Sequence, residues 1–278
     1  METGILYVVA TPIGNLEDIT LRAIRILKEA DLIAAEDTRR TLKILNHYEI
    51  TKPLISYHRH NEGTKSDILI NKILEGNNIA IVTDAGTPGI SDPGEEIVKE
   101  AISKNIEVIP IPGACALVNA IIASGLNTKE FAFFGFLPLN KKNREEILNK
   151  IKEEQKTVIL YEAPHKLIKT LEDIQKNIGN IKCVLAKEIT KVHEKFIRGN
   201  ISDLLEIMKE PKGEYVIILD LNEYTDCNRN KIYDEICEKS IEEQYKIYQK
   251  QGMSKKDIIK KIAKNKNLPK NEIYKMFI

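Results

Sequence analysis

The segment Ala35–Thr41 reads AEDTRRT and places two acids directly before two arginines. The carboxylates of Glu36 and Asp37 could accept a proton from a hydroxyl group, and the Arg39 guanidinium suits a forked contact with a phosphate. A structural role is equally open, because an Asp at this point is a good N-cap for a following helix. The segment therefore predicts acid–base chemistry on a hydroxyl group or, alternatively, a helix cap.

A second polar segment, SYHRHNE, occupies Ser56–Glu62. Its histidines, His58 and His60, could act as a base or stack on a planar ring. The alternative is an ordinary polar loop, and the segment alone does not choose between the two.

The segment Ile79–Gly94 reads IAIVTDAGTPGISDPG and joins an apolar run to a loop rich in Gly and Pro. The run Ile79–Val82 predicts a strand buried on both faces, as in parallel sheets. The glycines allow positive φ or a close approach of the backbone to a ligand. Asp92 and Pro93 read as the N-cap and first residue of a helix. Open α/β sheets bind ligands at such strand ends, so we expect a ligand here.

Short apolar runs alternate with amphipathic segments between Ile5 and Gly113, which is typical of βα repeats. We expect strands at 5–10, 32–35, 54–57, 79–82 and 106–109, and helices at 20–30, 38–48, 64–74 and 93–103, with Thr20 as an N-cap.

A proline-rich stretch ending in Gly113 interrupts this rhythm, so we place a domain boundary there. A second α/β unit follows, and its later strands allow an antiparallel arrangement in which 192–198 forms a hairpin arm. The predicted domains are 1–113, 114–222 and a linker with a basic helical tail at 223–278. The second unit has expected helices at 115–124, 144–154, 164–177 and 202–209, and strands at 131–136, 157–161, 181–186 and 215–219.

The tail carries most of the charge asymmetry of a chain whose formal net charge is only +1. Ten lysines and two acids lie between Gln244 and Ile278. This excess fits a polyanionic partner or a solvated lysine-rich face. Ser254 with Asp257 predicts a capped helix, and Ile273, Met276 and Phe277 are the expected apolar face of the last helix.

The bulk composition, 42% hydrophobic and 30% charged residues, is that of a globular protein. No apolar run approaches the roughly 20 residues that cross a bilayer, and no signal peptide is evident, so we expect a cytoplasmic protein without a membrane partner. The four cysteines form no CxxC pair and have no histidines at zinc-like spacing, which predicts reduced cysteines and no metal site.

Two common nucleotide-binding patterns are missing. The loop TPIGNLEDIT at Thr11–Thr20 follows the first strand but lacks the GxGxxG pattern of dinucleotide-binding loops. The sequence GTKS at Gly63–Ser66 lacks the upstream glycine of a phosphate-binding loop. Kinase, GTPase and classical dehydrogenase activities are therefore disfavoured.

Taken in order, seven segments resemble one family. They are TPIGNLEDIT, AEDTRRT, SYHRHNE, DAGTPGISDPG, IPIPGACA, FFGFLP and LYEAPHKL, and they span roughly residues 4 to 220. Together they resemble the tetrapyrrole methylase superfamily, which comprises the class III S-adenosylmethionine methyltransferases, and within it the ribosomal RNA small subunit methyltransferase I group.

The resemblance implies two α/β domains with S-adenosylmethionine bound in the cleft between them, in a homodimer. It assigns the cofactor to four segments of the chain. Carried over, the binding residues are Pro12, Gly14, Asp84, Ala85, Gly86, Pro88, Pro112, Gly113, Ala116, Leu160, Tyr161, Glu162 and Ala163.

Two departures bear on the substrate. Tetrapyrrole-type members tend to have PGDP and GGDP in the first and second loops, whereas this chain has IGNL and AGTP. Each loop lacks a carboxylate, which argues against a porphyrin-like substrate. The EDTR pattern at Glu36–Arg39 is similar to that of the ribosomal RNA group, in which carboxylates could activate a ribose hydroxyl.

The resemblance therefore implies 2′-O-methylation of a cytidine ribose in the decoding region of 16S rRNA, within the small ribosomal subunit. We expect Asp37 or Glu36 as the base, Arg39 as a phosphate contact, and His60 as a further catalytic candidate. Two alternatives remain: a precorrin-type C-methyltransferase, and a non-catalytic RNA-binding assembly factor with the same fold.

Overall fold

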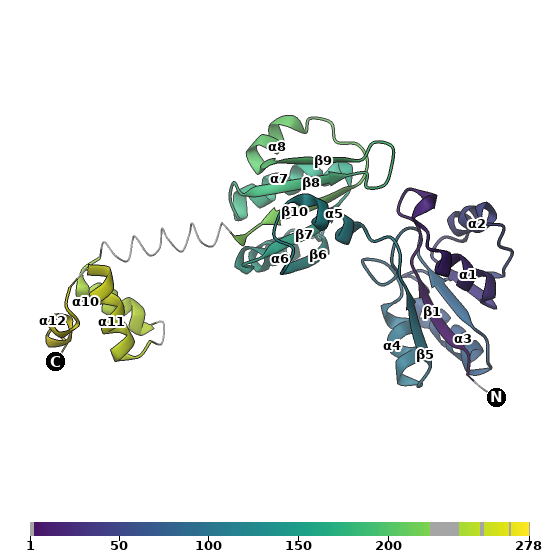
Figure 1. Cartoon of the computed structure of the whole chain (residues 1–278), viewed down its shortest axis with the longest axis horizontal. Coiled ribbons are helices and arrows are strands. Elements are labelled where there is room, and N and C mark those ends of the chain that lie inside the picture. Colours follow the sequence, from purple (N-terminus) through teal and green to yellow (C-terminus); the bar gives the residue numbers. More distant parts are fainter. Residues whose placement is uncertain (1–2, 223–238, 251–252, 267, 278) are drawn as a thin grey trace. The chain divides into compact units, whose positions relative to one another are not determined.

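A computed structural model describes residues 3–222, 239–250, 253–266 and 268–277 of the chain. It forms two compact units, unit 1 (Met1–Leu221) and unit 2 (Asn222–Ile278). Unit 1 contains two five-stranded sheets, and the described part of unit 2 is helical (Figure 1).

The first sheet is entirely parallel, with the strand order β3-β2-β4-β1-β5. Its elements follow the predicted βα rhythm: β1 (Ile5–Val9), a 3-10 turn (Leu16–Asp18), α1 (Leu21–Glu29), β2 (Leu32–Ala35), α2 (Thr38–His47), β3 (Leu54–Ser56), α3 (Glu62–Leu74), β4 (Ile79–Val82), α4 (Glu95–Ser103) and β5 (Glu107–Ile111).

Helices cover both faces of this sheet. Residues of α1 and α2 pack with Ala80 and Val82 of β4, whereas residues of α3 and α4 pack with Ile79 and Ile81. All four β4 residues are buried, as the apolar run predicts. The hydroxyl of Thr20 accepts a hydrogen bond from the Ala23 amide at 3.1 Å, which confirms the predicted N-cap of α1.

The strand β5 continues through Pro110, where we expected it to have ended. It pairs with β1 at one edge of the sheet, and a proline is tolerated on an edge strand because its missing N–H breaks no ladder bond there.

The second sheet is mixed, with the order β6-β7-β10-β8-β9. Only β6 and β7 are parallel, and β9 pairs back on β8, which confirms the predicted hairpin arm. One face is covered by α5. The elements are α5 (Ala116–Ser124), β6 (Phe131–Phe136), α6 (Lys141–Glu153), β7 (Thr157–Glu162), α7 (Pro164–Asn177), β8 (Lys182–Lys187), β9 (Lys195–Asn200), α8 (Ile201–Ile207) and β10 (Tyr215–Asp220).

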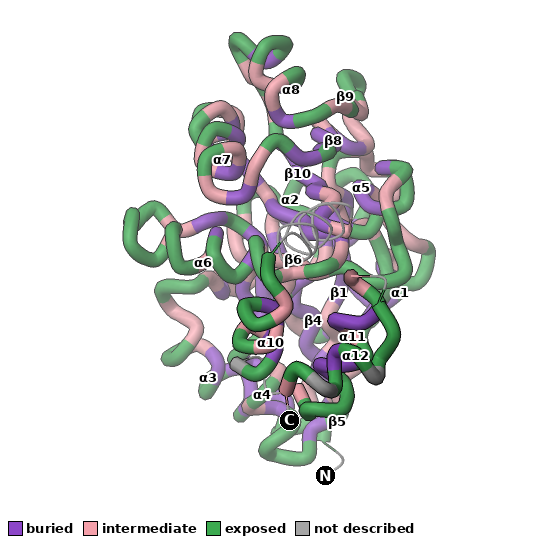
Figure 2. The backbone as a smooth tube through the Cα atoms, turned by 90° about the vertical axis from the view of Figure 1, so that its left-hand side faces the viewer, coloured by how far each residue is buried: buried purple, intermediate pink, exposed green. Residues whose placement is uncertain are grey.

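Unit 2 contains α10 (Ile241–Lys250), α11 (Lys255–Lys266) and α12 (Lys270–Lys275) around a small core of its own. The tube coloured by burial shows the buried stretch of α11 (Figure 2). The Ser254 hydroxyl accepts from the Asp257 amide, so the predicted cap is present. Met276, just after α12, is 61% exposed, so the expectation that it belongs to the apolar face was wrong; Ile273 is fully buried.

Cys115 and Cys183 are free thiols, and Cys227 and Cys237 lie outside the described residues. Within the described ranges, no helix is long and apolar enough to span a membrane, and no group of acidic, histidine and cysteine side chains could hold a metal ion. The domain limits at 113 and 222 stay predictions.

Candidate functional site

The carboxyl ends of β2 and β4 bring three acids together. The Asp37 amide donates to Asp84 Oδ1 at 2.9 Å, and the Asp84 amide donates to Glu36 Oε2 at 3.3 Å. Arg40 pairs with Asp84 Oδ2 at 3.1 Å. These contacts join residues almost fifty positions apart because β2 and β4 are parallel neighbours whose ends share one edge.

Asp37 is the N-cap of α2. Its Oδ1 accepts from the Arg39 amide at 2.9 Å, and Arg39 Nη2 lies 3.0 Å from Oδ2. The hydrogen bonds from Arg39 lower the pKa of Asp37 to about 2. A carboxylate with so low a pKa is a weak base. Asp37 caps α2, which was the alternative to acid–base chemistry.

Glu36 has the opposite electrostatic environment. Burial raises the pKa of Glu36, and the charge of Asp84 adds to this effect, while the Asp84 amide, Arg59 and Arg40 oppose it. A carboxylate with a raised pKa accepts protons more readily near neutral pH. Of the two adjacent acids, Glu36 is therefore the better base.

Asp92 belongs to the site, although the sequence predicts it as the N-cap of a helix. The predicted helix start at Pro93 was wrong: α4 begins at Glu95, with Gly94 as N-cap at φ 136°. The Gly94 amide donates to Glu62 Oε1 at 3.1 Å, so Glu62 binds the amide of the N-cap residue, and the N-cap itself has no side chain to cap the first turn of α4. The sequence Asp-Pro-Gly is compatible with a helix that begins at Pro93 and with one that begins at Glu95. Gly94 indicates the second, because glycine readily takes the positive φ of this N-cap.

The side chain of Asp92 lies in the wall of a cavity instead. Burial raises the pKa of Asp92 to about 6, with a further contribution from the charge of Glu36, against the opposing charge of Arg59. Asp92 is therefore partly protonated near neutral pH and lies within electrostatic reach of Glu36.

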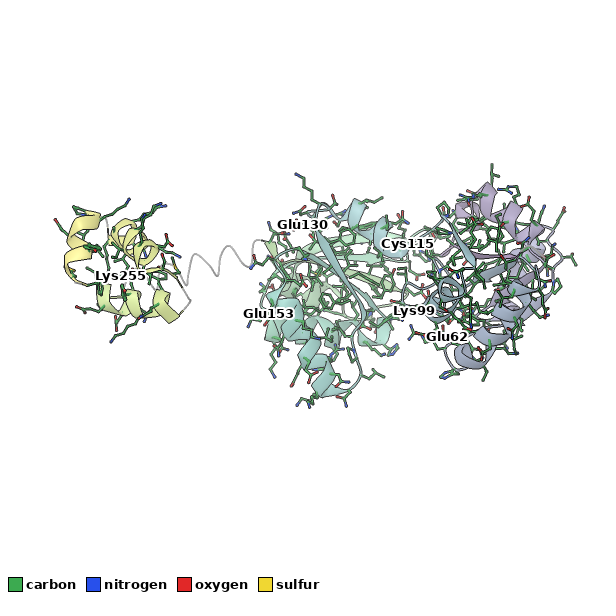
Figure 3. The ribbon with its side chains drawn as sticks, turned by 90° about the horizontal axis from the view of Figure 1, so that it is seen from below. Glu62, Lys99, Cys115, Glu130, Glu153 and Lys255 are labelled. Carbon is green, nitrogen blue, oxygen red and sulfur yellow. The ribbon has the colours of Figure 1, made fainter. Side chains whose placement is uncertain are left out.

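The cavity has a volume of about 420 Å³, within the range of roughly 300–1,000 Å³ typical of small-molecule sites. Segments that follow β1 and β4 line it together with the start of α5 and parts of the second sheet. Figure 3 labels Cys115, one of the lining residues at the start of α5. The lining also includes Ile13, Ala85–Thr87, Ile90–Asp92, Ala116, Phe136, Tyr161–His165, Ala186, Ile189 and Glu214–Val216.

Comparison with known proteins identifies the family. Residues 5–205 match the model of the Tetrapyrrole (Corrin/Porphyrin) Methylases. A protein of Halalkalibacterium halodurans named ribosomal RNA small subunit methyltransferase I is 46% identical, over 99% of this chain and 95% of its own. The chain belongs to the ribosomal RNA small subunit methyltransferase I family. Its activity is that of a methyltransferase.

Two further similarities concern the length of the chain and its fold. A Thermotoga maritima protein of the same name is 44% identical, and the alignment covers 78% of this chain but 98% of that protein. A uroporphyrin-III C-methyltransferase from Thermus thermophilus, solved with S-adenosyl homocysteine, has a TM-score of 0.56 at 17% identity, over 78% of this chain and 97% of its own, and it supports the fold.

Six of the thirteen residues predicted to bind the cofactor line the cavity, and seven do not. Gly14 approaches the side chain of Lys191, Gly113 approaches Ala10, and Asp84 is engaged by Asp37 and Arg40. The lining residues are Ala85, Gly86, Ala116, Tyr161, Glu162 and Ala163; the others are Pro12, Gly14, Asp84, Pro88, Pro112, Gly113 and Leu160.

All four predicted catalytic residues lie outside the cavity lining: Glu36, Asp37, Arg39 and His60. The Arg39 side chain is 89% exposed. His60 is exposed, and its ring centroid lies 5.9 Å from that of His58. These positions suit contacts with a large substrate better than contacts with a buried small molecule.

Two polar groups give the cavity a fixed shape. The Tyr161 hydroxyl accepts from the Leu117 amide at 3.1 Å and so caps α5, and burial raises the pKa of Tyr161. Glu162 is 3% exposed, and its carboxylate accepts from the Ala163 amide and from the Thr170 hydroxyl. The wall near α7 is therefore held by hydrogen bonds within the protein.

The cavity fits a nucleoside-sized donor. Gly86 has φ +85°, and a Cβ there would lie 3.1 Å from Ile13 Cγ2, so the glycine keeps this part of the wall open. The walls combine apolar side chains with the carboxylates of Glu162 and Asp92, as small-molecule sites usually do.

Proposed function

We propose that the protein methylates the 2′-oxygen of a cytidine ribose in the decoding region of 16S rRNA, with S-adenosylmethionine as donor. The observation that carries this proposal is a nucleoside-sized cavity with Asp92 in its wall. The carboxylate of Glu36 interacts electrostatically with Asp92 and has a raised pKa. The names of the relatives, which specify small-subunit ribosomal RNA, support the RNA substrate.

The donor, when bound, supplies a methyl group on a sulfonium that a nucleophile can attack in line. Ala85, Gly86, Ala116 and Tyr161–Ala163 would hold it. Holding the two reactants in position can contribute about 7–11 kcal/mol towards the barrier. Most of the catalytic contribution is therefore positional.

A ribose hydroxyl is a weak nucleophile at neutral pH, so a base should help. Glu36 is our candidate, with Asp92 as its neighbour at the cavity wall and Arg39 as an exposed phosphate contact. A positioned base contributes about 10²- to 10⁴-fold. Asp37 stays in the site as the N-cap of α2, and His60 as a possible contact to the substrate.

The base assignment is tested with Glu36→Gln and Asp92→Asn, alone and combined, alongside Asp37→Asn. Asparagine is also a good N-cap, so Asp37→Asn keeps α2 capped. We expect Glu36→Gln to lower kcat at least 100-fold with unchanged donor affinity by calorimetry, and Asp37→Asn to lower it less. If the double variant Glu36→Gln/Asp92→Asn turns over normally, the assignment is wrong.

The substrate is tested with S-adenosylmethionine labelled in the methyl group. Small ribosomal subunits, protein-free 16S rRNA and a porphyrinogen are each offered. The label on RNA is located by nuclease digestion and the label on the porphyrinogen by mass spectrometry. We expect a 2′-O-methylated cytidine. Label on carbon of the porphyrinogen would establish the tetrapyrrole alternative, and donor binding without transfer would establish the assembly factor.

We further propose a cytoplasmic homodimer that acts on the small ribosomal subunit. Light scattering measures the mass in solution, and a monomer mass at working concentration would contradict the dimer. A higher rate on subunits than on protein-free rRNA is the result expected for an assembled substrate.

A further inference from the structure

Unit 2 is separable from the methyltransferase fold. It has its own core, which includes Tyr248, Ile258, Ile262 and Ile273. The Thermotoga maritima relative bears the same family name, although 98% of its length aligns with 78% of this chain, a share that matches unit 1 alone. Chemistry in this family therefore does not need a segment like unit 2, which makes a binding role the better explanation.

One face of α11 carries a lysine stripe, which we define as Lys256, Lys260 and Lys264. Their spacing of four residues places them one above another on the helix, and all three are exposed. Throughout the described residues, none of the three side chains has a hydrogen bond, ion pair or ring contact. Like charges at this spacing destabilise a helix by about 0.2–0.5 kcal/mol per pair, so an external anion would stabilise it.

Three neighbouring charges on α11 are engaged elsewhere, those of Lys255, Asp257 and Lys261. Lys255, labelled in Figure 3, donates to the Phe277 carbonyl at 2.8 Å, and Lys261 lies over the Tyr248 ring at 4.6 Å. Asp257 hydrogen-bonds to Ser254 at the helix start. The lysine stripe is thus the row of exposed charges on α11 that is free to meet a charged partner, and Lys266 at the end of the helix is half-buried.

The opposite face of α11 decides the kind of partner. Ile258, Ile259, Ile262 and Ala263 are buried in the core of unit 2. A helix that lies on a membrane needs an apolar face for the lipid, and α11 has already buried its apolar face. A rigid row of lysines without an apolar face matches the phosphates of a nucleic acid.

We propose that the lysine stripe of α11 binds the phosphate backbone of the RNA substrate, so that unit 2 adds affinity to the reaction of unit 1. This inference rests on the proposed function for the identity of the RNA. It predicts an effect on KM and on the salt dependence of binding, and no effect on the chemical step.

The test compares the full-length triple variant Lys256→Gln/Lys260→Gln/Lys264→Gln with the matched control Lys142→Gln/Lys150→Gln/Lys152→Gln. The control removes three exposed lysines from α6 and changes the net charge equally. Glutamine has nearly the helix propensity of lysine, and circular dichroism verifies the folding of both. The probe is protein-free 16S rRNA, bound at several salt concentrations.

We expect the stripe variant to lose about 2 from the slope of log K against log salt, as the loss of three phosphate contacts predicts, with kcat unchanged at saturating RNA. The control should keep the wild-type slope.

Three outcomes would overturn the proposal. They are equal slopes in all three proteins, an equal loss in both variants, and a loss of binding to phosphatidylserine vesicles with RNA binding unchanged. If the stripe variant has the smaller salt slope but the wild type transfers no methyl group to the RNA, the proposed function fails and this inference stands.

Discussion

At the scale of single residues, the site separates acids that look alike in the sequence. Asp37 and Glu36 are adjacent, yet hydrogen bonds from Arg39 lower the pKa of Asp37 to about 2, whereas burial raises the pKa of Glu36. Asp92, one of the acids at the cavity wall, has a pKa raised to about 6. Environment, not residue type, assigns the roles of these carboxylates.

The pKa of Asp92 predicts a pH-dependent stability. A folded-state pKa above the unfolded value means that the folded protein binds the proton more tightly, so stability falls as pH rises through about 6. Asp92→Asn stays neutral. We therefore expect the unfolding free energy of Asp92→Asn, relative to that of the wild type, to increase between pH 4 and pH 7.5. The increase should be on the order of 1 kcal/mol after solvent screening. Urea titrations at both pH values measure this, and a constant difference would contradict it.

At the scale of elements, close backbone approaches shape the segments that enter the site. Gly113 connects β5 to α5, and a Cβ there would lie 2.8 Å from Ala10 Cβ at the end of β1. Gly63, near the start of α3, has open space around its Cα. The same substitution should therefore have opposite effects at the two glycines.

We expect Gly113→Ala to lower the unfolding free energy by about 1–3 kcal/mol, because the crowded methyl group must displace neighbouring backbone. Gly63→Ala should be neutral or stabilising by up to about 1 kcal/mol, because alanine restricts the unfolded chain. Urea unfolding of both variants provides the comparison. Similar stabilities would show that the approach at Gly113 is not tight.

At the scale of the whole molecule, the two units have separate cores. Ile262 is fully buried within unit 2, and its core residues all belong to that unit. Ile262→Ala should therefore destabilise unit 2 by about 2–5 kcal/mol and leave unit 1 unchanged.

Hydrogen exchange followed by mass spectrometry distinguishes the units. We expect peptides of α10 and α11 to lose protection in Ile262→Ala, while peptides of β1 and β4 keep wild-type protection. Leu171→Ala, which removes a buried side chain of α7, is the reciprocal control. Loss of protection in β4 from Ile262→Ala would mean that the units unfold together.

Local patterns in the sequence were enough to predict most elements. The apolar run at β4, the caps at Thr20 and Ser254, and the helix α7 at Pro164–Asn177 each depend on neighbours within a few residues. The ordered segments also predicted the family, because each is a short pattern that can be recognised from consecutive residues.

Only the tertiary structure decided which acids face the cavity. Asp92 lines it because α4 begins two residues later than expected, at a point where Glu62 of α3 accepts from the Gly94 amide. The raised pKa of Glu36 likewise depends on burial and on Asp84, 48 residues away, whereas the low pKa of Asp37 comes from its neighbour Arg39. Hydrogen bonds and desolvation between distant segments leave no periodic signal in the sequence, so the chain alone determined most of the elements and the fold determined the environments of Glu36 and Asp92.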